Sequence, residues 1–285
     1  MLQDGNYILN IGRKLKSIMM ETEQERRERL HREDLARLRG LRPIDDDFMR
    51  CIFKDNVPLA QLTLRIITEK QDLIITSVET QKDIKRLVGG RSVCLDAYGV
   101  DSEGKKYDLE IQREDKGAGK RRARYHSSVM DVENLDAGQA FDELPDTYTI
   151  FITEHDIFGR GKPIYHVERM MLETDDLFDD GEHIMYVNGE YRDDSDIGKL
   201  MHDFGCSDPN QMLLNEFRDV TRYYKETEKG VSTMCKVMED MRNEAKIENA
   251  IEVAKNLIRR GKYTLEEIAE DTKLSLEQVK ELAGA

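Results

Sequence analysis

Apolar positions recur along the chain with two different periods, which separate helical segments from strands. A charged helix is predicted over residues 13–39, with helically spaced apolar residues at both ends, and Gly40 and Pro43 end it. A short helix over "DDDFMRCIF" follows, and then a helix that begins at Pro58. A strand is expected near Leu73–Val78, and two more flank "DSEG", which is typical of a hairpin.

The second half of the chain continues this alternation and then becomes helical. "RRARYHSSVMDVENL" predicts a helix, "TYTIFIT" a fully buried strand, and "PIYHVERMML" and "HIMYVNGEY" further strands. From Pro209 to about Arg260 the pattern is helical, with a break near Gly230. The order helix, three strands, helix, strand predicts an α/β core. We expect a helical extension over 1–40, the α/β domain over 41–208, a helical region over 209–262 and a small cap over 263–285.

The predicted cap consists of two short helices in "YTLEEIAEDTKLSLEQVKELA". Thr264 with Glu267, and Ser275 with Gln278, have the spacing of capping boxes. The pair resembles a helix-turn-helix, but its second helix carries Lys280 as its one basic residue. A packing or dimer-forming cap is therefore favoured over a transcription regulator. Its expected shared core is Ile268, Ala269, Leu274, Leu276, Val279 and Leu282.

The charge of the chain is uneven. The net charge of −14 over 285 residues argues against binding to nucleic acid, since phosphate binding relies on Lys and Arg. However, residues 1–130 carry 26 Lys and Arg against 22 Asp and Glu, whereas residues 131–219 carry 6 against 23. The acidity belongs to the middle of the chain, so a basic surface in the first part stays available.

Other features of the composition exclude several classes of protein. No apolar run approaches the roughly 18 residues of a membrane span, and the start lacks the pattern of a signal peptide. Cys51, Cys94, Cys206 and Cys235 lack the paired spacing of a zinc site or a disulfide framework. We expect a reduced cytoplasmic protein without a membrane partner, and the long helices are candidates for a homodimer contact.

The predicted hairpin carries unusual acids in "LDAYGVDSEGKKYDLEIQR". If Asp96 faces Glu110, the loop is Ser102-Glu103-Gly104, a favoured form in which the glycine takes the left-handed conformation. The Cβ atoms of the two acids would then lie about 5 Å apart. Asp108 and Gln112 would share their face, while the residues between them point into the core.

Carboxylates this close raise one another's pKa unless a cation neutralises them. Mg²⁺ suits such a site, with Mn²⁺ as an alternative, because it binds a few carboxylates and leaves positions for phosphate oxygens. A metal there can polarise a scissile phosphate and activate an attacking water. The alternative is a solvated outer face of a two-stranded ribbon.

A basic segment, "REDKGAGKRRARYHS", follows the hairpin directly. A glycine-containing basic loop that leads into a helix, next to an acidic pair, predicts a clamp for the DNA backbone. The alternative is a basic loop that balances the acidic third of the chain. His126 lies near this helix, either facing phosphate or as a structural residue. The residues expected to bind DNA are Lys116, Lys120, Arg121, Arg122 and Arg124.

"LDAYGVDSEGKKYDLEIQ" resembles the core of the PD-(D/E)XK nuclease superfamily. Together with "DDDFMRCIF" and "LPDTYTIFITEHDIFGRGKPIYHVER", it resembles the PD-(D/E)XK nuclease family transposases over residues 41–240. The resemblance implies a restriction-endonuclease-like core in which Asp96 and Glu110 bind the metal and Gln112 occupies the position of the usual Lys. It also implies a third acid among Asp45, Asp46 and Asp47, for which we take Asp47.

The glutamine at position 112 leaves two functions open. Lys would bring a positive charge to the reacting phosphate, whereas Gln offers neutral donors and an acceptor. The resemblance implies a Mg²⁺-dependent DNA endonuclease, with Asp96, Glu110 and Gln112 as catalytic residues, that acts in transposition or recombination. The alternative is a weak or inactive nuclease fold that serves as a binding or regulatory module. A guanidinium or hydroxyl from Arg121, Arg124 or Tyr125 could supply the missing group.

Overall fold

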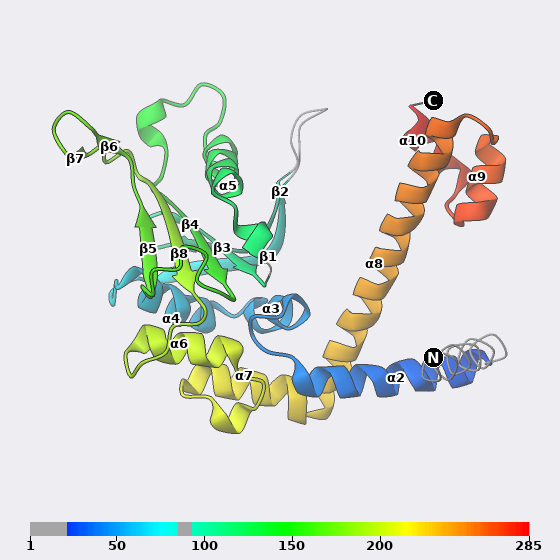
Figure 1. Cartoon of the computed structure of the whole chain (residues 1–285), viewed down its shortest axis with the longest axis horizontal. Coiled ribbons are helices and arrows are strands. Elements are labelled where there is room, and N and C mark those ends of the chain that lie inside the picture. Colours follow the sequence, from blue (N-terminus) through cyan, green and yellow to red (C-terminus); the bar gives the residue numbers. More distant parts are fainter. Residues whose placement is uncertain (1–21, 85–92, 114, 285) are drawn as a thin grey trace, which may run out of the picture. The chain divides into compact units, whose positions relative to one another are not determined.

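The computed structural model describes residues 22–84, 93–113 and 115–284. By their contacts, residues 35–231 form one compact unit, and the described residues before Leu35 form another with the segment from Ser232 onward. The larger unit holds a mixed six-stranded sheet with helices on both faces (Figure 1). This confirms the predicted α/β class and restriction-endonuclease-like core. The four-part division at residues 40, 208 and 262 stays a prediction.

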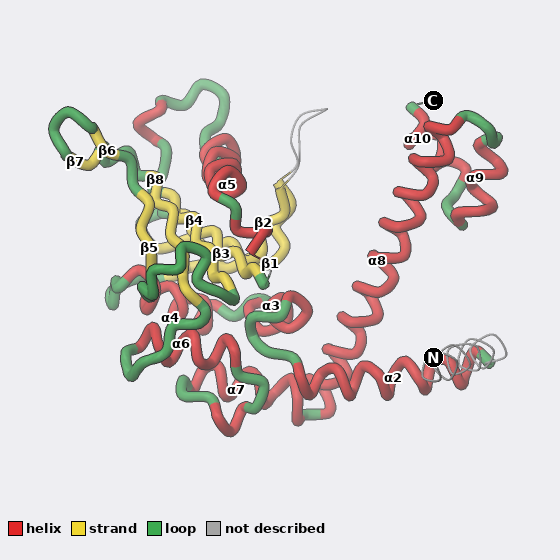
Figure 2. Tube along the Cα trace, viewed as in Figure 1, coloured by secondary structure: helices red, strands yellow, loops and turns green. Residues whose placement is uncertain are grey.

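The sheet has the strand order β1-β2-β3-β4-β8-β5 (Figure 2). Strands β1, β2 and β3 form an antiparallel meander, β4 and β8 continue it in parallel to β3, and β5 closes the far edge antiparallel to β8. The strand bounds are β1 Ile75–Ile84, β2 Val93–Asp101, β3 Lys106–Gln112, β4 Thr147–Thr153, β5 Ile164–Val167 and β8 Glu182–Asn188. A separate small hairpin consists of β6 Met170–Met171 and β7 Asp176–Leu177.

The hairpin of β2 and β3 has the predicted register. Ala97 pairs with Leu109 and Val100 with Lys106, which places Asp96 opposite Glu110. The backbone N–H of Asp101 donates to the carbonyl of Lys105, so the loop is residues 102–104. Gly104 has a φ of 88°, in the left-handed region that favours glycine. The turn chemistry therefore fixes which side chains of the two strands meet.

Helices cover both faces of this sheet. Helix α5 (Lys120–Glu133) lies on one face, and α3 (Asp46–Phe53), α4 (Val57–Thr68), α6 (Asp196–Gly205) and α7 (Asn215–Glu226) lie on the other (Figure 1). Asp108 and Glu110 are both 0% exposed. The interpretation of this strand face as solvated is therefore wrong, because α5 covers it. Short 3₁₀ helices also connect the elements, namely η1 Asp115–Ala118, η2 Phe141–Glu143 and η3 Pro209–Gln211.

The remaining helices largely follow the sequence pattern. Helix α2 spans Glu23–Gly40, and the earlier part of the helix predicted over 13–39 lies outside the described residues. The predicted break near Gly230 occurs at Thr227, between α7 and α8 (Glu228–Arg260). None of the helices within the described ranges is long and apolar enough to cross a membrane.

The C-terminal helices pack as a cap on the end of α8. Helices α9 (Leu265–Thr272) and α10 (Leu276–Ala283) both begin with the predicted capping boxes. Ile268, Leu274 and Val279 are buried together with Ala254 of α8, which confirms the predicted packing of these apolar residues. Burial of that face against α8 accounts for the pattern without any DNA contact.

Candidate metal centre and active site

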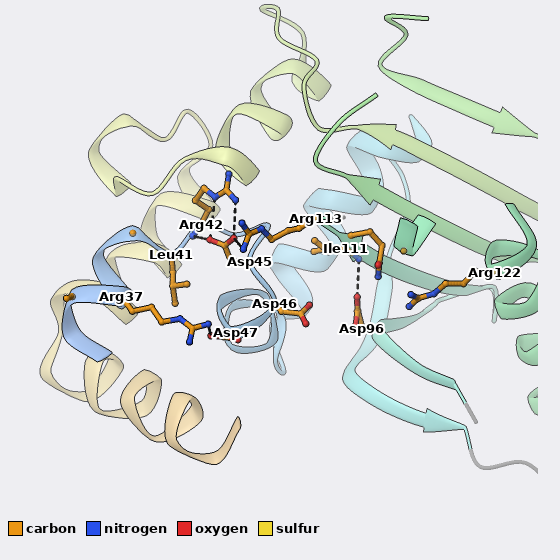
Figure 3. A pocket seen from close by; sticks show the side chains of 14 residues that line it. Arg37, Leu41, Arg42, Asp45, Asp46, Asp47, Asp96, Ile111, Arg113 and Arg122 are labelled. Atoms are coloured by element: carbon orange, nitrogen blue, oxygen red, sulfur yellow. Dashed lines mark hydrogen bonds and ion pairs between the residues drawn. The ribbon is translucent and has the colours of Figure 1, made fainter. Parts of the chain in front are cut away.

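A cavity of about 850 Å³ opens at the carboxyl end of β3, between the start of α3 and the start of α5. Four arginines and four aspartates line it, so the cavity is strongly polar. Figure 3 shows these side chains converging from three sides. The segment before and within α3 contributes Arg37, Leu41, Arg42, Asp45, Asp46 and Asp47; the sheet contributes Asp96, Ile111, Gln112 and Arg113; η1 and α5 contribute Gly117 and Arg122.

Asp96 and Glu110 are held together by reciprocal hydrogen bonds between β2 and β3. The backbone N–H of Asp96 donates to Glu110 Oε1 at 3.1 Å, and the N–H of Ile111 donates to Asp96 Oδ2 at 3.1 Å. Each carboxylate is thus oriented by the backbone of the facing strand. The spacing of the two acids along the hairpin predicted that they face each other, and the register of β2 and β3 confirms it.

Burial disfavours the ionised forms of these acids when no cation lies beside them. Burial raises the pKa of Asp96 to about 6, and the negative charge of Asp46 adds to the effect. Burial also raises the pKa of Glu110 well above its usual value, with contributions from Asp108 and Asp96, and it raises that of Asp108 in the same way. The cluster would therefore gain from positive charge placed beside it.

Arg122 supplies part of that charge from α5. Its Nη2 donates to Glu110 Oε2 at 3.0 Å, and its Nε donates to His126 Nε2 at 3.2 Å. Since a guanidinium can act only as a donor, His126 Nε2 must carry the lone pair and Nδ1 the proton. That proton faces Asp108 Oδ2 at 3.2 Å. Neutral His126 therefore links Asp108 to Arg122 and orients the guanidinium toward Glu110.

The three acids at the start of α3 have different surroundings. Asp45 accepts from the backbone N–H of Arg42 at 2.7 Å, and its carboxylate pairs with Arg42 and Arg113 at 3.1 Å each. Asp47 is buried and pairs with Arg37 at 2.5 Å. Asp46 is exposed, and its side chain makes no hydrogen bond or ion pair with the residues that the structure describes. Figure 3 shows the Asp46 carboxylate turned toward Asp96.

The side chain of Gln112 packs against a glycine. A Cβ placed on Gly117 would lie 1.9 Å from Gln112 Oε1, so this position leaves room for the amide because it has no side chain. Both residues line the cavity. The Gln112 backbone carbonyl accepts from the N–H of Glu154, which joins the end of β3 to the end of β4. The amide thereby lies at the wall of the cavity.

Comparison with protein families identifies the family of this chain. A family model of the PD-(D/E)XK nuclease family transposases matches residues 59–267, most of the chain. The chain belongs to this family. Membership supports a nuclease or transposase-related role, as the hairpin motif indicated. Comparison with curated proteins gives no match, and neither does comparison with solved structures.

The acids around the cavity of this PD-(D/E)XK family member are of the donor type that a divalent metal prefers. Asp46, Asp96 and Glu110 offer carboxylate oxygens, the ligands that Mg²⁺ and Mn²⁺ prefer. Asp108 Oδ1 is buried without a hydrogen-bond partner, so the acidic cluster is not fully compensated by the protein. Among the described residues, the trio whose ligand atoms lie within 4.8 Å of one another is Asp108, Glu110 and His126, and all three of these residues are buried.

The predicted DNA-binding residues divide into two groups. Lys120, Arg121 and Arg124 are exposed on α5, whereas Arg122 turns into the cavity toward Glu110. The backbone of Lys116 lies in η1, and its side chain is outside the described part of the structure. The first turn of α5 contains no acidic residue, although a helix N-terminus normally favours acids. The cations of this turn and the positive end of the helix dipole would both attract an anion.

Sequence reasoning missed Gln81 and did not foresee the contact between Arg122 and Glu110. Gln81 Nε2 donates to Asp96 Oδ1 at 3.3 Å, and Gln81 has a φ of 56°, which is unusual for a non-glycine residue within a strand. A single glutamine in a polar strand gives no signal for this role. Arg122 was assigned to the DNA backbone because its neighbours are basic. Its i, i+4 spacing to His126 was the available clue to a shared inward face.

Proposed function

We propose that this protein is a metal-dependent DNA endonuclease that hydrolyses phosphodiester bonds. The observation that carries the proposal is Asp96, which lines a polar cavity together with Asp46 and Arg122 and is linked by hydrogen bonds between β2 and β3 to the buried Glu110. A role in transposition or recombination follows from the family alone. A homodimer contact through α2 and α8 stays a prediction.

The metal would be held by Asp46, Asp96 and Glu110. We place Asp46 in this set instead of Asp47 because the latter is engaged by Arg37, whereas Asp46 faces Asp96 without a cation of its own. A bound Mg²⁺ or Mn²⁺ would polarise the scissile phosphate and lower the pKa of the attacking water. The reciprocal hydrogen bonds between β2 and β3 would keep both carboxylates in place throughout.

Gln112 and Arg122 would together replace the usual lysine: Gln112 would orient the attacking water, and Arg122 would supply the positive charge. The Gln112 amide can accept a hydrogen bond from the attacking water and donate one to a phosphate oxygen, which orients the nucleophile without adding charge. Arg122 would bring the permanent positive charge of its guanidinium. It can reach a substrate because it lines the cavity and its side chain is 42% exposed. A guanidinium there can stabilise the negative charge that develops on the phosphate.

The exposed cations of α5 would hold the DNA backbone beside this cavity. Lys120 and Arg121 lie in the first turn and Arg124 in the next, so all three extend from the end of the helix that adjoins the cavity. Phosphate contacts of this kind position the substrate without reading its sequence.

Cleavage of supercoiled plasmid by the full chain tests the proposal directly. We expect nicking with Mg²⁺ or Mn²⁺ and none with EDTA. Asp46→Asn should lower the cleavage rate about 100-fold, since it removes one carboxylate from the metal, whereas Asp47→Asn should change it only a few-fold. Asp47→Asn is the matched control, because it removes an adjacent acid from the same helix. Absence of cleavage with every metal, with DNA binding retained, would favour the inactive binding module.

Gly117→Ala tests the position of the Gln112 amide. The added Cβ would collide with Gln112 Oε1, and the end of that flexible side chain can move aside, so we expect the fold to survive. The cleavage rate should fall about tenfold, in line with the loss of one orienting hydrogen bond. Gln112→Ala should have the same effect, and the double variant should be no worse than either single variant. Additive losses in the double variant would contradict this coupling.

A further inference from the structure

The loop between β4 and β5 contains two cations that the catalytic proposal does not use. Arg160 and Lys162 stand in "GRGKP", within the most acidic part of the chain. Both are exposed, and neither forms an ion pair with any residue in the described part of the structure. The other cations of residues 131–219 are engaged: Arg169 with Asp180 and Glu182, Arg192 with backbone carbonyls, Lys199 with Asp196, and Arg218 with Asn215 and the Met212 carbonyl.

The backbone of this loop is fixed by hydrogen bonds to side chains within the loop itself. Asp156 accepts hydrogen bonds from the N–H groups of Phe158 at 3.1 Å, Gly159 at 3.0 Å and Gly161 at 2.7 Å. The Tyr165 hydroxyl donates to Asp156 Oδ2 at 2.7 Å. Gly159 and Gly161 have φ values of 62° and 65°. The loop is thus a preorganised turn, which reduces the entropy lost when its side chains bind a ligand.

A second set of bonds ties the two basic residues themselves to this core. The backbone N–H groups of Arg160 and Lys162 donate to the Tyr165 hydroxyl at 3.3 and 3.2 Å. The carbonyl of Lys162 accepts from Asn188 Nδ2 at 3.2 Å. Because the backbone polar groups point inward, the two charged side chains are left for an external partner.

The loop adjoins the proposed active site. Glu154, two residues before Asp156, pairs with Arg42 at 2.8 Å and with Arg113 at 3.6 Å, and both arginines line the cavity. Phe158 packs on the cluster that includes Ala118 of η1 and Ala123 of α5. Lys120 Nζ lies 5.4 Å from the centre of the Phe158 ring. The loop that carries the two cations therefore packs, through Phe158, against the basic end of α5.

We propose that the loop Asp156–Tyr165 is a second binding element for the phosphate backbone of DNA, outside the cleavage cavity. This inference rests on the proposed nuclease function. Two unpaired cations on a rigid turn match the regular negative charge of a nucleic-acid strand. The surrounding acidic segment would repel DNA elsewhere, so Arg160 and Lys162 would confine the strand to the path that includes Lys120.

The test is a salt titration of DNA binding by the full chain, in EDTA so that no cleavage occurs. Arg160→Ala with Lys162→Ala should weaken binding of a labelled duplex about tenfold or more, and the slope of log affinity against log salt should fall by about 1 to 2. The matched control is Lys199→Ala with Arg222→Ala, which also removes one Lys and one Arg, both paired with acids. The control should leave affinity and slope unchanged.

Cleavage kinetics of the same variants separate this inference from the nuclease proposal. The loop variant should raise KM and leave kcat within about twofold, because its residues position the substrate and do not reach the metal site. Arg160→Glu with Lys162→Glu should weaken binding further. Unchanged affinity in both loop variants, or an equal loss in the control, would overturn the role of the loop alone. A wild-type chain that neither binds nor cleaves DNA would overturn the nuclease proposal as well.

Discussion

Replacing Asp96 with Asn, or Glu110 with Gln, is expected to lower the rate of metal-dependent DNA cleavage by at least about 1,000-fold, or roughly 4 kcal/mol in the activation barrier. Both substitutions keep the size of the side chain and remove a metal ligand. The measurement is single-turnover cleavage of plasmid with saturating enzyme and Mg²⁺. We also expect the metal-free variants to be at least as stable as the wild type, since each removes a buried negative charge from a repelling cluster.

A control on the same hairpin makes this result specific. Glu103→Gln removes a carboxylate from the loop between β2 and β3, where the side chain is 71% exposed and pairs with Lys105. It should cleave at the wild-type rate. If Asp96→Asn retained most of its activity while staying folded, Asp96 would not belong to the catalytic centre, and the buried trio Asp108, Glu110 and His126 would become the next candidate.

The register of this hairpin could be predicted because local chemistry determines it. A glycine in the left-handed conformation ends a three-residue loop, and this places Asp96 opposite Glu110 without reference to the rest of the fold. Strand β4 could be predicted equally well from the sequence, since "TYTIFIT" is apolar enough to be buried along its whole length. In both cases the determining residues lie next to one another in the sequence.

The surroundings of the site could not be predicted, because they depend on contacts between segments far apart in the sequence. The pattern of polar and apolar residues does not show such contacts. Three consecutive aspartates, Asp45 to Asp47, cannot be told apart in the sequence. In the structure they differ in their ion pairs: Asp45 pairs with Arg42 and Arg113, and Asp47 pairs with Arg37. The burial of Asp108 follows from α5 lying over β3, which strand alternation alone leaves open. The acids proposed to bind the metal were therefore easier to find from the sequence than the arginines that pair with Asp45 and Asp47.

Metal binding should appear as thermal stabilisation, independently of any cleavage. At a free Mg²⁺ concentration about 100 times Kd, the free energy of unfolding should rise by about 2.7 kcal/mol. For a chain of this size, this corresponds to an increase in Tm of very roughly 5–10 °C. Differential scanning fluorimetry near neutral pH would measure it. Asp96→Asn should lose the shift, and Glu103→Gln should keep it.

The pH dependence of stability gives the same site a second signature. The pKa of Asp96 is about 6 in the folded chain, against an ordinary value of 3.8, so the folded state binds this proton more tightly than the unfolded state does. The contribution of Asp96 to the stability of the metal-free protein should then be greatest below about pH 4 and fall as the pH rises through about 6. Protons and metal compete for the same oxygens, so the Tm shift caused by Mg²⁺ should shrink between neutral pH and about pH 5. A shift that is independent of pH, or one that survives in Asp96→Asn, would show that the metal binds elsewhere on the protein.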